Sequence, residues 1–154
     1  MFKKILVPTD GSKFSQKAYR TALEIGELSK AEIILLHVIS LSSTYWRASE
    51  PFPIVIEESD LEETAQEVLN STVEGVDQRG LVVRMRKESG YPAQVIIDMA
   101  EDEGVDLIVM GNHGYSPFVA TVLGSVSQRV LYGATCPVLI VKEDEQKPNI
   151  NVKK

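Results

Sequence analysis

The sequence predicts an α/β fold in which an open, parallel, five-stranded sheet carries helices on both faces. Five short apolar runs alternate with four segments whose apolar residues recur at helical spacing. The apolar runs span residues 5–7, 32–39, 81–87, 106–110 and 137–141. Strands that alternate with helices in this way form a parallel sheet through right-handed crossovers.

The polarity of the second and third runs decides between two strand orders. Run 32–39 is nearly all apolar, as expected for a strand buried on both faces. Run 81–87 alternates Val and Met with Arg, which is typical of an edge strand or of one solvated face. The order 3-2-1-4-5 places this third run at an edge, whereas 2-1-3-4-5 would expose the second. We therefore predict the order 3-2-1-4-5, a Rossmann-like arrangement.

The first half of the chain contains two predicted helices. Run 5–7 closes in Pro-Thr-Asp-Gly-Ser, and a helix follows with apolar residues at helical spacing. These residues are Phe14, Ala18, Ala22, Ile25 and Leu28. After run 32–39, a second amphipathic helix is expected to end near Gly80. Its inward-facing residues are Leu61, Ala65, Val68, Leu69, Thr72 and Val76.

The second half contains the other two helices. Pro92 suits the first turn of a helix whose apolar face includes Ile96 and Met99, and Gly104 ends that helix before run 106–110. The last helix is expected to begin near Gly124 and Ser125, and run 137–141 forms the fifth strand.

Length and charge exclude several classes of protein. The 154 residues suit one domain, expected at residues 1–143, with a polar tail at 144–154. The net charge of −6 and the absence of a basic cluster argue against nucleic acid as a main partner. No apolar stretch approaches the ~20 residues of a membrane span, so we expect a cytoplasmic protein. Cys136 is the only cysteine, which excludes an intrachain disulfide and favours a packed thiol.

The predicted topology places a ligand site at the carboxyl ends of the first and fourth strands. The winding direction reverses between these strands, and open α/β sheets bind ligands at such a reversal. The first strand ends in Pro8-Thr9-Asp10, and the fourth ends in Met110-Gly111. Two independent observations, topology and sequence, therefore indicate one crevice.

A glycine pattern follows the fourth strand and indicates a phosphate site built from backbone amides. Gly111, Gly114 and Gly124 are spaced Gly-x2-Gly-x9-Gly, and Ser125 follows directly. Glycine lets main-chain amides approach an anion closely, and Ser125, Val126 and Ser127 present amides and hydroxyls at a helix start. The alternative is an ordinary turn, a loose loop and a serine cap. Neither Gly-Lys-Ser/Thr nor Gly-x-Gly-x-x-Gly occurs, so fast phosphoryl transfer is not expected.

Three polar side chains near the crevice have two possible roles each. Asp10 could accept hydrogen bonds from ribose hydroxyls, or it could cap the turn into the first helix. His113 could donate to a phosphate, or it could be a solvated loop residue. His37 lies within an apolar strand, where a hydrogen-bonded core histidine is expected.

Two further segments suggest contacts with a ligand or a second subunit. Residues 40–57 include Tyr45, Trp46 and Phe52, and could fold over a ligand, pack on a neighbouring subunit or cover the surface. The fifth strand is an apolar edge in the predicted order, which favours a homodimer by strand addition unless the tail covers it. The residues expected at that interface are Val138, Leu139, Ile140 and Val141.

The chain strongly resembles the universal stress protein family, in its single-domain, ATP-binding branch. The resemblance covers nearly the whole chain and rests on five segments. Residues 40–57 are not among them, because they match no fixed family pattern. These segments are Lys-Lys-Ile-Leu-Val-Pro-Thr-Asp-Gly-Ser, Leu-Leu-His-Val, Gly-Val-Asp-Leu-Ile-Val-Met-Gly-Asn-His-Gly, Leu-Gly-Ser-Val-Ser and Cys-Pro-Val-Leu-Ile-Val.

The resemblance implies a role for each matching residue. Asp10 and Gly111 would hold ribose, and the main chain of Val38 would meet the adenine edge with Pro8 and Thr9 nearby. Met110 would line the pocket. The phosphates would be surrounded by Gly114, Gly124, Ser125 and Ser127. The family also implies a homodimer through the last strand, ATP as ligand, sometimes Mg or Mn held through the phosphates, and a role in stress survival.

Three functions follow as hypotheses. The first is a regulatory protein whose nucleotide-bound and empty states differ in the order of residues 112–123, a difference that an unknown downstream protein reads. The second is a slow ATPase or phosphotransferase assisted by Asp10 or His113. The third is a dimeric interaction module without nucleotide. No base-and-nucleophile pair is visible in the sequence, so we expect a binding protein with no catalytic residues and at most weak ATP hydrolysis.

Overall fold

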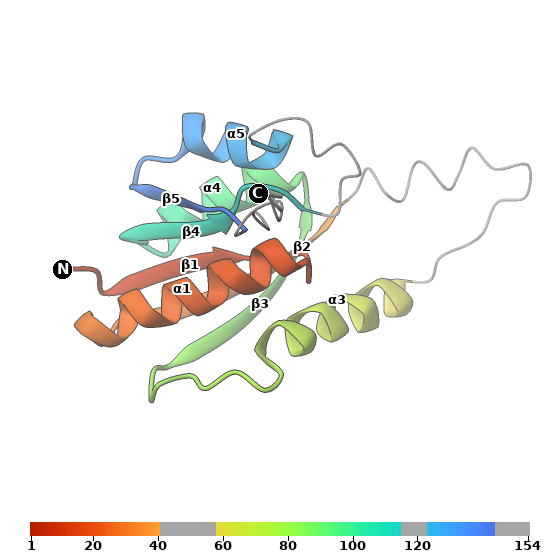
Figure 1. The fold of residues 1–154 in the computed structure, drawn as a ribbon. Coiled ribbons are helices and arrows are strands. Elements are labelled where there is room, and N and C mark those ends of the chain that lie inside the picture. Colours follow the sequence, from red (N-terminus) through yellow and green to blue (C-terminus); the bar gives the residue numbers. More distant parts are fainter. Residues whose placement is uncertain (41–57, 115–122, 144–154) are drawn as a thin grey trace, which may run out of the picture.

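The computed structural model describes residues 1–40, 58–114 and 123–143, and within them the chain forms an α/β sandwich (Figure 1). The strands are β1 (Lys4–Pro8), β2 (Glu32–Ser40), β3 (Val83–Gly90), β4 (Leu107–Gly111) and β5 (Val138–Val141). The helices are α1 (Lys13–Ser29), α3 (Glu58–Val73), α4 (Pro92–Asp102) and α5 (Ser125–Gly133).

The predicted strand order is confirmed. The five strands form one parallel sheet in the order β3-β2-β1-β4-β5. β1 lies at the centre, where Leu6 is in register with Ile34 of β2 and with Ile108 of β4. The winding therefore reverses between β1 and β4, as the sequence predicts.

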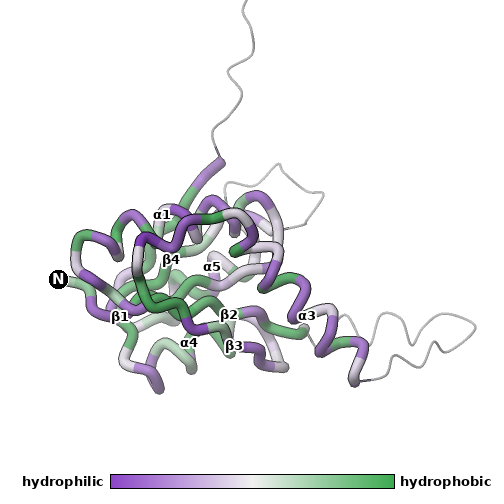
Figure 2. The backbone as a smooth tube through the Cα atoms, turned by 90° about the horizontal axis from the view of Figure 1, so that it is seen from below, coloured by the Kyte–Doolittle hydropathy of each residue, from purple (hydrophilic) through white to green (hydrophobic). Residues whose placement is uncertain are grey.

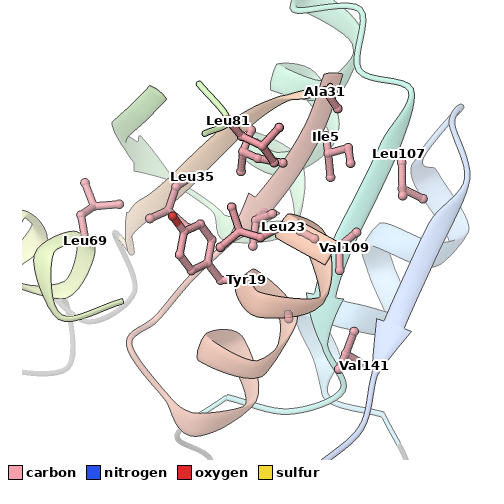
Figure 3. Packing of buried hydrophobic residues seen from close by; sticks show 14 residues of the cluster. Ile5, Tyr19, Leu23, Ala31, Leu35, Leu69, Leu81, Leu107, Val109 and Val141 are labelled. Carbon is pink, nitrogen blue, oxygen red and sulfur yellow. The ribbon is translucent and has the colours of Figure 1, made fainter. Parts of the chain in front are cut away.

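Helices cover both faces of the sheet because side chains along each strand alternate between the faces. Ile5 and Val7 of β1 belong to a buried cluster with residues of α1 and α3, whereas Leu6 belongs to a second cluster with residues of α4 and α5. Figure 3 shows Tyr19 and Leu23 of α1 packed in the first cluster. The hydrophobic segments of the backbone gather in the interior, along the central strands (Figure 2).

Two element boundaries differ from the predicted ones. α3 ends at Val73 rather than near Gly80, because the chain turns through positive φ at Gly75 (67°), Arg79 (55°) and Gly80 (70°). β3 covers Val83–Gly90 rather than residues 81–87, although the side chain of Leu81 is buried in the first cluster. The amide of Leu81 bonds to the carbonyl of Gln78 at 2.9 Å, so residue 81 still belongs to the turn.

Ion pairs explain the charged residues of β3 at the sheet edge. Glu103, which follows α4, lies 2.7 Å from the guanidinium of Arg84 and 3.0 Å from that of Arg86. The Nζ atom of Lys4 lies 3.5 Å from the same carboxylate. The hydrogen bond from Arg84 is the main reason why the pKa of Glu103 lies below its ordinary value. The arginines of β3 thus connect the edge strand to α4.

The sequence also gives predictions for Cys136, for membrane spans and for two segments of the chain. Cys136 is half-buried against the second cluster, and burial raises the pKa of its thiol. In the described part of the chain, no helix is long and apolar enough to cross a membrane. The predicted tail at 144–154 and the aromatic segment, apart from Ser40, lie outside the described residues.

Candidate functional site

The structure brings the end of β1 and the loop after β4 into direct contact. Asp10 follows β1, and Gly114 lies in the loop that follows β4. Gly114 is so close to Asp10 that a Cβ atom at position 114 would collide with the Oδ2 atom of Asp10. Two residues 104 positions apart in the sequence, 10 and 114, therefore meet at the predicted crevice.

The two oxygens of the Asp10 carboxylate have different surroundings. Oδ1 accepts hydrogen bonds from the amide of Ser12 at 2.9 Å and from the hydroxyl of Ser15 at 3.1 Å. Oδ2 faces Gly114. Ser12, and not Asp10, is the N-cap of α1, and its hydroxyl accepts from the amide of Ser15 at 3.3 Å. Asp10 thus shapes the turn with one oxygen, and its other oxygen lies against the loop that follows β4.

The backbone around Thr9 is fixed by β2. The amide of Thr9 donates to the carbonyl of Leu36 at 2.8 Å, which extends the pairing of β1 and β2 beyond Pro8. His37 Nδ1 lies 2.8 Å from the carbonyl oxygen of Thr9. A carbonyl only accepts, so Nδ1 carries the proton. His37 is hydrogen-bonded, as predicted, and its bond holds the residue that precedes Asp10.

Val38 and Met110 lie near the carboxyl ends of β2 and β4. Met110 is 5% exposed and belongs to the second core cluster, and the half-buried Val38 packs against that cluster. Their contacts with a base and a pocket remain predictions.

Gly111 has a packing role in addition to any role in binding. A Cβ atom at this position would lie 2.8 Å from Cβ and 3.0 Å from the carbonyl carbon of Phe14. Phe14 belongs to the first turn of α1, so the absence of a side chain at Gly111 lets α1 lie directly on the end of β4. The sequence predicts the close approach of a ligand, or an ordinary turn, at this glycine, but not its contact with Phe14.

The start of α5 is joined to the same loop. The amide of Gly124 donates to the carbonyl of Asn112 at 2.7 Å, which brings the two ends of the intervening loop together. Gly124 is the N-cap of α5 and makes no side-chain cap. Amides in the first turn of a helix have no acceptor within the helix and carry partial positive charge. The amides of Ser125, Val126 and Ser127 belong to that turn.

The hydroxyl of Ser127 is directed at the strand. Ser127 is buried, and its Oγ donates to the carbonyl of Gly111 at 2.9 Å, so the side chain fixes α5 to the end of β4. A phosphate contact by this hydroxyl remains a prediction.

Two basic side chains lie near the loop. The ring of His113 meets the ring of Phe14 edge-on, with centroids 5.8 Å apart. Lys13 Nζ lies 5.4 Å from the centroid of the Phe14 ring and 2.7 Å from a carboxylate oxygen of Glu143, just after β5. The sequence indicates His113 but not Lys13, because Lys13 reaches this region only through the packing of α1 on β4.

Comparison with known proteins decides the family, because residues 1–142 match the universal stress protein family. The chain belongs to that family.

Relatives and solved structures agree with this assignment. Universal stress protein MJ0531 of Methanocaldococcus jannaschii is 35% identical over 147 residues, which cover 96% of this chain and 86% of that protein. The structure of MJ0577, a universal stress protein of the same organism, has a TM-score of 0.79 at 34% identity and covers 94% of this chain and 99% of its own.

A third relative was solved with a nucleotide. The universal stress protein of Archaeoglobus fulgidus in complex with dAMP has a TM-score of 0.66 at 24% identity, covering 91% of this chain and 98% of that chain. At this identity the likeness shows the shared fold.

A hollow of this universal stress protein lies away from Asp10, between β3 and α4. Its volume is about 220 Å³, and its lining includes Arg86 and the carboxylates of Glu88, Asp98, Asp102 and Glu103. Four carboxylates against one guanidinium disfavour a phosphate ligand. The crevice at Asp10 is therefore the better candidate site for a nucleotide.

The described residues contain no group of three or more His, Cys, Asp and Glu side chains arranged to hold a metal ion. The predicted change of order in residues 112–123 falls largely on positions 115–122, which lie outside the described residues.

Proposed function

We propose that this chain is a cytoplasmic regulatory protein that binds ATP, or a related adenine nucleotide, at the crevice between β1, β4 and α5. The observation that carries the proposal is the contact between Asp10 Oδ2 and Gly114 beside an uncapped helix start. A carboxylate oxygen accepts from ribose hydroxyls, and first-turn amides donate to phosphates. One edge of the sheet thus offers the acceptor and the donors that a nucleotide needs.

The surroundings of the crevice support the same ligand class. His113 lies beside Gly124, since a Cβ atom at position 124 would be 3.8 Å from His113 Nδ1. An imidazole at this place can donate to a phosphate that approaches α5. The dAMP complex of the Archaeoglobus fulgidus relative makes adenine nucleotides the first ligands to test. Any Mg or Mn would be held mainly by the phosphates.

Binding rather than turnover is the proposed activity. The sequence offers no phosphate-binding lysine of the Gly-Lys-Ser/Thr type, and Asp10 Oδ1 is occupied by Ser12 and Ser15. The signal is then whether a nucleotide is bound, and a downstream protein distinguishes the bound state from the empty one. A slow ATPase is the alternative, and hydrolysis that is lost in His113→Ala while ATP binding persists would favour it.

The start of α5 offers a sharp test. Gly124 has φ −70° and ψ 163°, which valine also adopts, and a Cβ atom there would be 3.4 Å from the carbonyl of Asn112, an ordinary contact. Gly124→Val should therefore fold but should lose ATP affinity at least about tenfold, because a branched side chain occupies the phosphate position. Isothermal titration calorimetry with ATP measures the change.

Tyr91→Val is the matched control. Tyr91 is the N-cap of α4, has extended backbone angles and makes no side-chain cap, as Gly124 does at α5. The control should keep wild-type affinity for ATP. Unchanged affinity in Gly124→Val would remove the proposed site.

Mass spectrometry of small molecules released from freshly purified native protein identifies the resident nucleotide. The absence of such a nucleotide, together with no measurable ATP binding, would favour the nucleotide-free interaction module.

We also propose that the protein forms a homodimer through β5. β5 is an edge of the sheet, and the side chain of Leu139 is 37% exposed. An apolar edge strand favours pairing with a second copy across a two-fold axis.

A further inference from the structure

Buried polar side chains gather beside Asp10. Five polar side chains are buried within the described residues, namely Thr9, Ser12, Ser15, Thr72 and Ser127. Ser127 bonds to the end of β4, and the other four form one hydrogen-bonded cluster that reaches Asp10. Burying a hydroxyl costs free energy unless its hydrogen bonds are made. Four buried hydroxyls at one place therefore need an explanation beyond packing.

Three of these hydroxyls form a path from α3 to the carboxylate of Asp10. Thr72 Oγ1 on α3 lies 2.8 Å from Thr9 Oγ1, and Thr9 Oγ1 lies 3.0 Å from Ser15 Oγ. Ser15 Oγ lies 3.1 Å from Asp10 Oδ1. Thr72 is 63 residues from Thr9 in the sequence, so the path connects two distant segments of the chain.

Counting protons gives the path a direction. Ser15 Oγ lies 3.1 Å from Asp10 Oδ1 and 3.0 Å from the carbonyl of Ser12, and both of these groups only accept. The bond to the charged carboxylate is the stronger of the two, so the Ser15 proton points to Asp10. Ser15 Oγ must then accept from Thr9, and Thr9 Oγ1 must accept from Thr72. The second lone pair of Thr9 Oγ1 takes the amide of Gly11 at 3.1 Å.

The other groups around the path are also satisfied by this direction. Ser15 Oγ has a second donor in the hydroxyl of Ser12 at 3.4 Å. Thr72 Oγ1 also lies 2.8 Å from the carbonyl of Val68, which is a second acceptor for its proton. With the Ser15 and Thr9 protons already assigned, the 2.8 Å contact between Thr9 and Thr72 is a hydrogen bond only if Thr72 donates to Thr9, so that three aligned hydroxyls end on one anion.

We propose that Thr72, Thr9 and Ser15 form a directed hydroxyl chain that holds Asp10 Oδ1, so that Oδ2 is presented to the ribose hydroxyls of the bound nucleotide. Ser15 is then a positioning residue for ribose recognition, and α3 is coupled to the ligand. The inference rests on the proposed function, because it needs a nucleotide at this crevice. Each hydroxyl polarises the next, so the effect on binding decreases with distance from Asp10.

The test compares ATP with 2′,3′-dideoxy-ATP, which lacks the ribose hydroxyls. Calorimetry on the wild-type protein should give about tenfold weaker binding of the dideoxy nucleotide, the expected effect of losing a hydrogen bond to a charged group. Ser15→Ala should reduce this preference to about threefold by weakening ATP binding alone. In an Asp10→Ala background, Ser15→Ala should change neither affinity.

Matched controls separate positioning from general damage. Thr21→Val removes another hydroxyl of α1, which donates to the carbonyl of Lys17 at 3.0 Å and does not join the chain. Thr72→Val should reduce the preference by about twofold. Ser71→Ala should not change it, although Ser71 and Thr72 both lie within hydrogen-bond distance of the carbonyl of Val68. The comparison of Thr72→Val with Ser71→Ala also keeps the test valid if Ser15→Ala does not fold.

The possible failures are distinguishable. A wild-type protein that binds neither nucleotide overturns the proposed function and this inference together. A wild-type protein that binds both nucleotides equally retains the proposed function but overturns ribose recognition by Asp10. Variants that keep the wild-type preference, or that lose affinity for both nucleotides equally, overturn the hydroxyl chain alone.

Discussion

At the scale of single residues, position 111 requires glycine because helix α1 packs directly on it. The position of its missing side chain is already occupied by the main chain and Cβ of Phe14. Backbone atoms at the first turn of α1 cannot move aside without shifting the helix, and α1 carries Ser12 and Ser15 toward Asp10. Packing at Gly111 therefore also influences the geometry of the candidate site.

Gly111→Ala should destabilise the protein by about 1–3 kcal/mol, the usual cost of inserting a methyl group into a packed region. Urea unfolding followed by circular dichroism measures this loss. Gly124→Ala is the control, because a methyl group there makes only ordinary contacts, at 3.4 Å or more. Equal stability of Gly111→Ala and the wild-type protein would show that α1 moves aside without cost.

The sequence could predict where Asp10 lies, but not how its oxygens are used. Strand and glycine patterns are local, and together with the topology they placed Asp10 opposite the glycine loop. The bond between Thr9 and Thr72 depends on how α3 packs on the sheet, across 63 residues of chain. Thr72 appeared in the sequence only as an inward-facing residue of a helix.

At the scale of elements, Glu103 fastens the edge strand to its neighbours. Its carboxylate bonds to Arg84 and Arg86 of β3 and lies near Lys4 of β1. The depressed pKa of Glu103 means that the folded state favours the ionised carboxylate. This contribution to stability is present above the unfolded pKa and is lost as the pH falls through the lower, folded pKa.

Glu103→Gln should therefore lower the melting temperature near pH 7 and should flatten its decrease as the pH falls below about 4.3, the ordinary pKa of glutamate. Melting curves from pH 7 to pH 3 make the comparison. Glu101→Gln removes an exposed carboxylate two residues earlier, on α4, and serves as the control. If both variants follow the wild-type curve, the network around Glu103 contributes no stability.

The order of the elements was predictable because charge and hydropathy differ between β2 and β3. The end of α3 was placed too late, at Gly80, because two glycines follow the helix and it is Gly75, two residues after Val73, at which the chain first turns through positive φ. The ion pair between Arg79 and Glu27 of α1, at 2.5 Å, depends on the tertiary fold and was invisible in the sequence.

At the scale of the whole molecule, the edge strand β5 favours a dimer. A single charged residue introduced into β5 should abolish that dimer. Leu139→Asp would place a carboxylate in an apolar strand pair, where its desolvation is costly. We expect a dimer mass for the wild-type protein and a monomer mass, or aggregation, for the variant by multi-angle light scattering.

Val82→Asp is the control for this experiment. Val82 is 69% exposed and precedes β3, at the opposite edge of the sheet. The control should remain dimeric. A wild-type monomer would overturn the dimer proposal, and a Leu139→Asp dimer would place the interface elsewhere.

The strand order also divides the sheet into an early and a late part of the chain. β1, β2 and β3 come from residues before 91, and β4 and β5 come from residues after 106. The crevice lies on the seam between β1 and β4, where these two parts meet. A nucleotide bound there would contact both parts of the chain. Because the site is built from both parts, a newly synthesised chain can acquire a complete site only after β4 and α5 have joined the first three strands.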